Sequence, residues 1–385
     1  MTDHITAFLG ADIFDGTEMH NDCALLVRGE RIQGIVPAAQ TPVNAQRTAL
    51  NGGTLAPGFV DLQVNGGNGV MFNDAPTVAT LRTIAQAHAG LGATSILPTL
   101  ITDTPAQVRA AIDAVEGAIA QGVAGIIGLH LEGPHLSQTR KGAHAPSLIR
   151  PMQADDLALL LEAARRLPVL KVTIAPESVP LDYMKQMADS GILLSIGHSD
   201  ATYDQCVAAA QNGARCVTHL FNAMSQLANR APGLVGAALE CGDLCAGLIA
   251  DLNHVHASTI AIALRAKKGP GRIFLVSDAM ATAGSDIDHF NLNGRRITRR
   301  EGRLTLTDGT LAGADLDLAT AIRNVTEVSH LPPQQAIAMA TSTPAQLVGQ
   351  QNDIGTLAGK TSADFIHLSQ GKLTAVWQSG ARISG

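Results

Sequence analysis

Short apolar runs alternate with longer alanine-rich stretches through the middle of the chain. Several of these stretches, such as TVATLRTIAQAHAGLG and TPAQVRAAIDAVEGAIAQG, carry apolar residues at helical spacing. The apolar runs predict strands, and they are GFVDLQV, TSILPTL, GIIGLHLEG, LKVTIAPE, GILLSIGHS, ARCVTHLFN, LCAGLIAD and IFLVSDAM. Repeated strand–helix units indicate a parallel sheet, and eight of them predict an α/β fold with a (β/α)8 TIM-like barrel.

The two ends of the chain have a different pattern, in which short apolar runs are separated by turn residues. CALLVRGERIQGIVP predicts two strands joined at residues 28–30, and ADFIHLSQGKLTAVWQSGARI predicts two more around residues 370–372. We therefore expect one small β-sandwich domain built from residues 1–57 plus 351–385. The barrel would form the second, larger domain and occupy residues 58–350.

Composition narrows the class of protein. The chain has 385 residues, of which 46% are hydrophobic, and its net charge is −6, which favours a globular protein with a large core. Its 27 Lys and Arg residues are scattered among 33 acidic ones, so we expect no nucleic-acid partner. No apolar run has the ~18 residues that a membrane span needs, and the N-terminus lacks the pattern of a signal peptide. Five unpatterned cysteines favour a reducing compartment, and we expect a cytoplasmic protein.

Ionisable residues gather at the ends of the predicted strands, where barrel enzymes carry their chemistry. Glu132, His198 and His219 provide one carboxylate and two imidazoles, which is the ligand set of a catalytic zinc site with one open position. A single histidine after a strand is more often an ordinary loop residue, but a carboxylate ending an apolar strand is costly unless it is paired or binds metal. Asp278 lies near the end of the last run, where it could act in catalysis or cap a following helix.

Several longer motifs point to one family. LEGPH, KGAH, IGHSDAT, VTHLFNAM, APGLVGAAL and VSDAMATAG resemble the N-acetylglucosamine-6-phosphate deacetylase family of the amidohydrolase superfamily, over essentially the whole chain. The resemblance implies metal-dependent hydrolysis of the acetamide of N-acetyl-D-glucosamine 6-phosphate to D-glucosamine 6-phosphate and acetate. This reaction belongs to amino-sugar catabolism and the recycling of cell-wall sugars.

The first barrel strand departs from the pattern of many amidohydrolases. Where relatives carry His-x-His after PGFVD, this chain has Gln63 and Asn65, and neutral amides are weak ligands for a transition metal. The resemblance therefore implies one divalent metal ion per chain, most simply Zn2+ with Fe2+ or a similar ion as the alternative. Gln63 would hydrogen-bond a metal-bound water without being a ligand itself.

The resemblance also implies roles for the remaining site residues. Glu132, His198 and His219 would hold the metal, Asp278 would accept and return a proton, and His144 would hold the carbonyl oxygen or a sugar hydroxyl. The resemblance further implies a homodimer, in which an arginine of the loop after the sixth barrel strand can reach the site of the neighbouring chain. The residues expected to bind substrate are His144, the backbone amides of Asn222 and Ala223, Arg230, His254, and a small-residue loop of Leu311, Ala312 and Gly313.

Other functions remain open at this point. One is an amidohydrolase acting on another N-acyl hexosamine phosphate or on a cyclic amide, although no strand ends in the lysine that cyclic-amide enzymes often carboxylate. Another is a catalytically inactive sugar-phosphate-binding homologue, which would be expected to have lost Asp278 or a metal ligand. Asp278 and the three predicted metal ligands are all present in this chain. The glucosamine and galactosamine forms of the substrate are both compatible with the sequence. In one further departure from the family, DLNH at 251–254 replaces the more usual DGLH.

Overall fold

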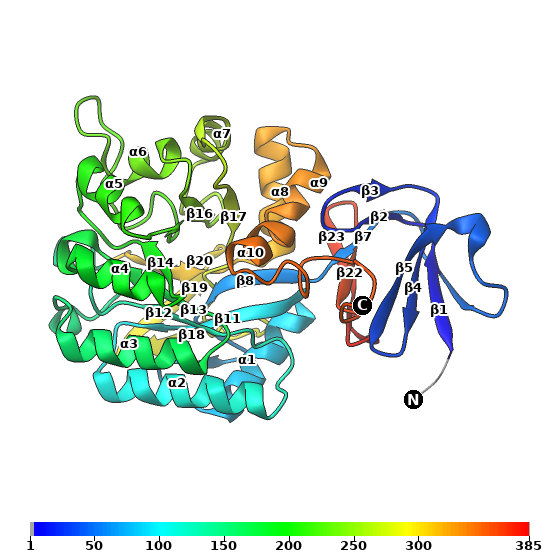
Figure 1. Cartoon of the computed structure of the whole chain (residues 1–385), viewed down its shortest axis with the longest axis horizontal. Helices are drawn as coiled ribbons and strands as arrows, with labels where there is room; N and C mark the ends of the chain where they lie inside the picture. Colours follow the sequence, from blue (N-terminus) through cyan, green and yellow to red (C-terminus); the bar gives the residue numbers. More distant parts are fainter. Residues whose placement is uncertain (1–3, 385) are drawn as a thin grey trace.

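The parallel barrel is the central feature of the computed structural model, which describes residues 4–384 (Figure 1). Each strand pairs in parallel with its neighbours, and each predicted run contains one strand, which confirms the fold class. In chain order the strands are β8 (Phe59–Val64), β11 (Ala93–Ile101), β12 (Leu129–Glu132), β13 (Leu170–Ile174), β14 (Leu193–Ile196), β15 (Cys216–Val217), β16 (Cys245–Leu248) and β17 (Ile273–Leu275).

The barrel closes just beyond β17 rather than along it. The backbone N–H of Asp278 donates to the carbonyl oxygen of Gln63 at 3.1 Å, and the N–H of Asn65 donates to that of Ala279 at 2.9 Å. A parallel bridge joins Val64 to Ala279 at the same place. This closing contact, which we call the seam, sets the segment that carries Asp278 directly beside the end of the first barrel strand.

Helices cover the outside of the barrel (Figure 1). Threonine side chains cap the first turns of three of them, because Thr77, Thr104 and Thr202 each accept a backbone N–H three residues on. The helices are α1 (Val78–Gly90), α2 (Pro105–Ala120), α3 (Ala154–Arg166), α4 (Leu181–Asp189), α5 (Tyr203–Gln211), α6 (Gly233–Glu240), α7 (Ala257–Ala266), α8 (Leu318–Ser329), α9 (Pro333–Ala338) and α10 (Ser342–Leu347), with 3-10 turns at Ala38–Gln40, Gln138–Arg140, Pro146–Leu148 and Pro176–Ser178.

Two further sheets lie beside the barrel, and the second uses strands from both chain ends. The first sheet has the order β5 (Arg31–Pro37), β4 (Cys23–Arg28), β1 (Ile5–Leu9) and β6 (Gln46–Ala49). The second has the order β24 (Ala381–Ser384), β23 (Lys372–Gln378), β22 (Phe365–Ser369), β7 (Thr54–Pro57), β2 (Asp12–Phe14) and β3 (Met19–His20).

An aromatic cluster joins these two sheets. The ring of Phe8, from the first sheet, lies 5.0 Å from that of Phe365 and 5.2 Å from that of Trp377, both from the second. Phe365 and Trp377 stack on each other at 4.7 Å. The sequence predicted two strands in the last segment, and the structure adds β24 as a third. Domain boundaries at 57/58 and 350/351 stay a prediction.

A four-stranded antiparallel sheet follows the barrel and was not predicted. Its strands are β18 (His289–Leu292), β19 (Arg295–Arg300), β20 (Arg303–Thr305) and β21 (Leu311–Ala314), and a small hairpin of β9 (Gly66–Gly67) and β10 (Val70–Met71) lies in the same apolar cluster. The expectation of a loop at Leu311 to Gly313 was therefore wrong, because these residues form a strand. The helix-cap alternative for Asp278 also fails, since the next helix, α8, begins only at Leu318.

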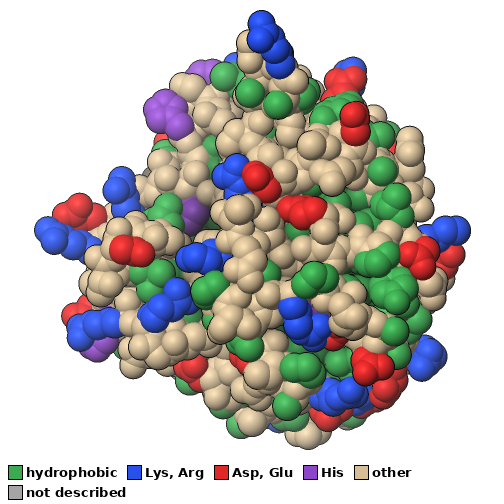
Figure 2. All heavy atoms as spheres, turned by 90° about the vertical axis from the view of Figure 1, so that its left-hand side faces the viewer, with side chains coloured by type: hydrophobic (Ala, Val, Ile, Leu, Met, Phe, Trp, Pro, Cys, Tyr) green, Lys and Arg blue, Asp and Glu red, His purple; other side chains and the backbone are tan. Residues whose placement is uncertain are grey.

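The surface shows charges of both signs. On the face in Figure 2, Lys and Arg side chains lie among Asp and Glu side chains, with small apolar areas between them. Among residues 4–384, no helix combines the length and the apolar character needed to cross a membrane.

Candidate active site

A pocket of about 510 Å³ lies at the carboxyl ends of the barrel strands, where the sequence placed the chemistry. Most of the predicted site residues line it, and these are Glu132, His144, His198, His219, Asn222, Ala223, His254, Asp278, Leu311 and Gly313. Gln63 is buried beside the pocket and bonds to two of its residues. Ala312 is fully buried and is not among the lining residues of this pocket.

Three of the lining residues form a group able to hold a metal ion. The Nε2 atoms of His198 and His219 lie 3.0 Å apart, and they lie 3.2 and 3.0 Å from Glu132 Oε1. Ligands bound tetrahedrally to zinc at 2.0–2.1 Å are separated by ~3.3 Å. The three atoms therefore have roughly the spacing of one face of such a coordination sphere. This donor set fits a single divalent ion with one position left open.

The protonation of this group suits metal binding. His198 Nδ1 lies 2.8 Å from the carbonyl oxygen of Arg140, which only accepts, so Nδ1 carries the proton and the Nε2 lone pair faces the group. Burial favours the neutral form of Glu132, but the close approach of His198 and His219 outweighs it and holds the carboxyl pKa well below its usual value. A carboxylate is the form that binds a cation.

The backbone is strained at the same place. His198, His219 and Asp278 have φ angles of 47°, 30° and 50°, in the left-handed region that residues other than glycine rarely adopt. Each follows a barrel strand by two or three residues. Such conformations persist only where surrounding contacts enforce them, and they cluster at functional sites.

Asp278 is oriented by two side-chain amides at the carboxyl end of the first barrel strand, one within β8 and one directly after it. Asn65 Nδ2 donates to Asp278 Oδ1 at 2.8 Å, and Gln63 Nε2 donates to the same oxygen at 3.1 Å. The Gln63 nitrogen also lies 3.3 and 3.4 Å from the two oxygens of Glu132, so it links a predicted ligand to Asp278. Burial and the charge of Glu132 raise the pKa of Asp278, which favours uptake of a proton.

Asn65 is a site residue to which the sequence gave no role. It lines the pocket and makes the shorter of the two amide contacts with Asp278. The available signal was its position two residues after Gln63, because alternate residues of a strand face the same side.

His144 forms one wall of the pocket beside the proposed ligands. Its ring packs edge-on against His198 with the centroids 4.3 Å apart, and its Nδ1 lies 2.8 Å from the hydroxyl of Thr102. Burial, followed by the charge of His198, lowers the pKa of His144 well below its usual value. The side chain is therefore a neutral imidazole at physiological pH, which makes it a hydrogen-bonding group rather than a cation.

The residues predicted to hold the phosphate are only partly assembled in one chain. His254 lines the pocket, and its Nδ1 is fixed by Asp251 Oδ2 at 2.7 Å. The backbone N–H of Asn222 donates to the carbonyl oxygen of His219 at 2.9 Å, so it is not the free donor that the sequence predicted. Ala223 lines the pocket. Arg230 is exposed in the loop before α6 and is not among the pocket residues.

Comparisons with known proteins agree with this geometry. The model of the Amidohydrolase family matches residues 54–383. The chain is 39% identical to N-acetylgalactosamine-6-phosphate deacetylase of Shewanella sp. (98% of this chain, 96% of the relative). It is 33% identical to N-acetylglucosamine-6-phosphate deacetylase of Haemophilus influenzae (91% and 92%). The crystal structure of N-acetylglucosamine-6-phosphate deacetylase from Pasteurella multocida superimposes with a TM-score of 0.93 at 33% identity, over 98% of this chain and 99% of the other.

Proposed function

Because the chain belongs to the amidohydrolase family, we propose that it hydrolyses the acetamide of N-acetyl-D-glucosamine 6-phosphate to D-glucosamine 6-phosphate and acetate. One observation carries the proposal. Glu132, His198 and His219 bring three ligand atoms within 3.0–3.2 Å of one another in the same pocket as the buried carboxyl of Asp278. This combination of a metal face and an adjacent proton acceptor is what hydrolysis of an unactivated amide requires.

The metal site would use only residues of this chain. Glu132, His198 and His219 would hold one divalent ion, and Zn2+ suits the mixed oxygen and nitrogen donors, with Fe2+ as the alternative. When bound, such an ion lowers the pKa of a coordinated water and polarises a carbonyl group. Gln63 lies behind the ligands and keeps the carboxylates of Glu132 and Asp278 in a fixed relation.

Asp278 would move the proton. Its Oδ1 already accepts two amide N–H groups, so its Oδ2 is the oxygen available to take a proton from the attacking water. The same oxygen would then return that proton to the nitrogen of the departing amine, because an amine leaves poorly as an anion. His144 would hold the acetyl oxygen or a sugar hydroxyl, and Leu311 and Gly313, which line the same pocket, would border the acetyl group.

The phosphate would lie at the side of the pocket formed by His254 and the backbone N–H of Ala223. Arg230 would complete this subsite from the neighbouring chain of a homodimer. Its exposed position in a loop, away from the pocket of its own chain, supports this arrangement. A guanidinium with backbone N–H donors is a common way to bind phosphate.

A second candidate substrate is N-acetyl-D-galactosamine 6-phosphate. The relative of this name from Shewanella sp. is 39% identical to the chain, and the two sugars differ only in the orientation of the hydroxyl group at C4. We place either reaction in amino-sugar catabolism. A cytoplasmic location is supported by the five cysteines, all of which are free thiols.

The test is to measure metal content together with acetate release from four sugars, namely each N-acetylhexosamine with and without its 6-phosphate. We expect about one tightly held ion per chain and turnover of the phosphorylated glucosamine derivative well above that of its unphosphorylated form. Faster turnover of the galactosamine derivative would establish the second candidate. Binding of the phosphorylated sugars without acetate release by the metal-loaded protein would show an inactive sugar-phosphate-binding homologue instead.

A further inference from the structure

Thr102 lies directly after β11 and contacts His144 through two groups. Its backbone N–H points at His144 Nδ1 at a distance of 3.4 Å, and its hydroxyl lies 2.8 Å from the same nitrogen. Both residues are almost completely buried, with exposed fractions of 1% and 3%. The two residues are 42 positions apart in the chain. The contact is therefore made by the fold and not by local structure.

The space for this hydroxyl depends on a glycine. A Cβ atom on Gly133 would lie 2.2 Å from Thr102 Oγ1, and Gly133 has a φ of +90°, which other residues rarely adopt. The same hydroxyl lies 3.3 Å from the carbonyl oxygen of Glu132. Thr102 thus sits between the chain segment that carries a proposed metal ligand and the ring of His144.

The contacts select one tautomer of the imidazole. A backbone N–H can only donate, so the N–H of Thr102 requires a lone pair on His144 Nδ1. The hydroxyl has one proton, and we assign it to the same lone pair at 2.8 Å rather than to the carbonyl oxygen of Glu132 at 3.3 Å. The opposite arrangement, with the proton on Nδ1, would set two N–H groups against each other at this distance. The proton of the neutral ring therefore belongs on Nε2.

We infer that Thr102 is a positioning residue that holds His144 as its Nε2–H tautomer, so that His144 donates a hydrogen bond to the acetyl oxygen of the substrate. The consequence for the substrate rests on the function proposed above, whereas the tautomer itself does not. An Nε2–H donor is useful at an oxygen on which negative charge develops during amide hydrolysis. The opposite tautomer would present a lone pair to that oxygen and repel it.

The first test reads the tautomer without substrate and without activity. Nitrogen-15 chemical shifts of the histidine rings would be recorded on the zinc-loaded protein, with His144 assigned by comparison with His144→Asn. We expect the Nε2–H form in the unmodified chain and in Thr102→Ser. We expect a mixture of forms in Thr102→Val, because only the longer contact from the backbone N–H at 3.4 Å then remains. An Nδ1–H form in the unmodified chain would overturn the inference, and this outcome depends on no variant being stable.

The second test asks whether Thr102 acts through His144. We expect Thr102→Val to lower kcat about tenfold with little change in KM, the usual scale for one hydrogen bond, while Thr102→Ser stays close to normal. In a His144→Asn background, Thr102→Val should have no further effect on kcat. An equal tenfold loss in both backgrounds would overturn the inference, because Thr102 would then act independently of the ring.

Thr99 supplies a matched control. Its hydroxyl also contacts a buried histidine nitrogen, His130 Nδ1, at 3.1 Å, but neither residue lines the pocket. Thr99→Val should leave the His144 ring signals unchanged even if it lowers stability. If the metal-loaded protein releases no acetate from any sugar, the proposed function fails, and the nitrogen shifts still decide the tautomer.

Discussion

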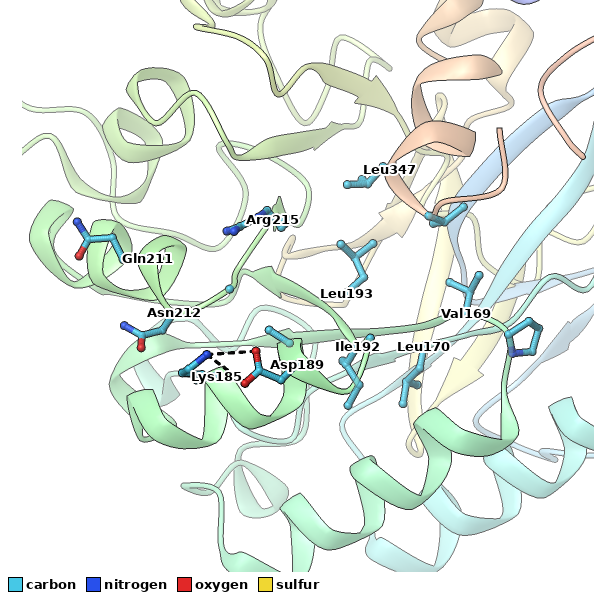
Figure 3. Close-up of a pocket in the computed structure, with 15 residues that line it drawn as sticks. Val169, Leu170, Lys185, Asp189, Ile192, Leu193, Gln211, Asn212, Arg215 and Leu347 are labelled. Atoms are coloured by element: carbon cyan, nitrogen blue, oxygen red, sulfur yellow. Dashed lines mark hydrogen bonds and ion pairs between the residues drawn. The ribbon is translucent and has the colours of Figure 1, made fainter. Parts of the chain in front are cut away.

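The barrel has a pocket at each end, and the two differ in chemistry far more than in size. The pocket at the carboxyl ends of the strands has about 510 Å³, and one at the amino ends has about 480 Å³. The amino-end pocket is shown in Figure 3, and its charged side chains are Lys185, Asp189 and Arg215. Lys185 and Asp189 pair with each other at 3.0 Å on the outer surface of α4, each 64% exposed.

Burial and convergence separate the two regions. Glu132 ends β12, His198 and His219 follow β14 and β15, and all three are at most 5% exposed. Contact between Glu132 and His219 lowers the pKa of the carboxyl and raises that of the imidazole. The pair at the amino end comes from one helix turn, and such exposed pairs contribute little. A cavity of a given volume therefore says little about function. Charged groups taken out of water and held close together by the fold are the better indicator.

The largest difference between the two ends should be in metal binding. His198→Asn or His219→Asn should lose the tightly held ion and, with it, all turnover, because two remaining ligands hold zinc weakly. Lys185→Gln, at the other end, should keep about one ion per chain. The measurement is metal content after dialysis together with acetate release. Two tightly bound ions in the active protein would contradict a site built from these three residues alone.

The next largest effect should come from Asp278. Asp278→Asn preserves the shape and the amide contacts of the side chain but cannot accept a proton, so turnover should fall by ~100-fold or more while the metal remains. Asp189→Asn is the matched change at the amino end and should leave turnover unchanged. Near-normal turnover of Asp278→Asn would assign the proton transfer to another group. Gln63→Ala should keep the ion and weaken catalysis.

One arginine near each end of the barrel allows a comparison in which the expected effect on kcat/KM is of intermediate size. Arg230→Ala should lower kcat/KM for the phosphorylated sugar roughly tenfold to hundredfold and affect the unphosphorylated sugar much less, as expected for one charge-assisted contact. Arg215→Ala, in the amino-end pocket, should affect neither. If Arg230 acts across a dimer, mixing Arg230→Ala with His198→Asn should restore activity in hybrid dimers. Equal losses on both sugars would remove Arg230 from the phosphate site.

The burial of Asp61 should make the stability of the protein depend on pH. Burial raises the pKa of Asp61, on β8, to about 7, whereas an unfolded chain has a value of ~3.9. Between these values the folded protein holds a proton that the unfolded chain has released, so stability from this group falls as pH rises from ~4 to ~7. Asp61→Asn cannot ionise. Its melting temperature relative to the unmodified chain should rise across this range and level off above it, and a constant difference would contradict the shift.

The smallest effect is expected for the exposed ion pair itself. Lys185→Gln and Asp189→Asn should each change the free energy of unfolding by less than ~0.5 kcal/mol, measured by denaturant titration, because exposed pairs are solvated and screened. A loss of several kcal/mol would show that this ion pair contributes more to the stability of the barrel than its exposure suggests.

The sequence predicted the barrel well because of how its strands are buried. All six residues of β8 and all nine of β11 are buried, so these strands appear as continuous apolar runs. The sheet of β18 to β21 was missed because only one side of it is apolar. In β19, for example, the six residues RRITRR include one buried side chain, Ile297. Such a segment gives no clear strand signal among its arginines.

The candidate site was predictable to the extent that its residues end strands. Glu132 and Asp278 stood out as carboxylates after apolar runs, and the motifs around them identified the family. Thr102 did not stand out, and Asn65 was noted only as a missing histidine, because their importance comes from contacts with residues 42 and 213 positions away. No local pattern encodes such a contact. Hydrogen bonds across the barrel become visible only when the strands are in place.

The seam also has a consequence for the order in which the protein becomes active during synthesis. Glu132, His198 and His219 belong to β12 and to the turns after β14 and β15, so the ribosome makes every proposed ligand before it reaches Asp278. Asp278, the proposed proton acceptor, is made after the proposed ligands, and it meets Gln63 and Asn65, which were made before them, only when the barrel closes. A chain that stops short of the seam contains all three proposed ligands but lacks Asp278. The proposed site is thus complete only when the first and last strands of the barrel are in contact.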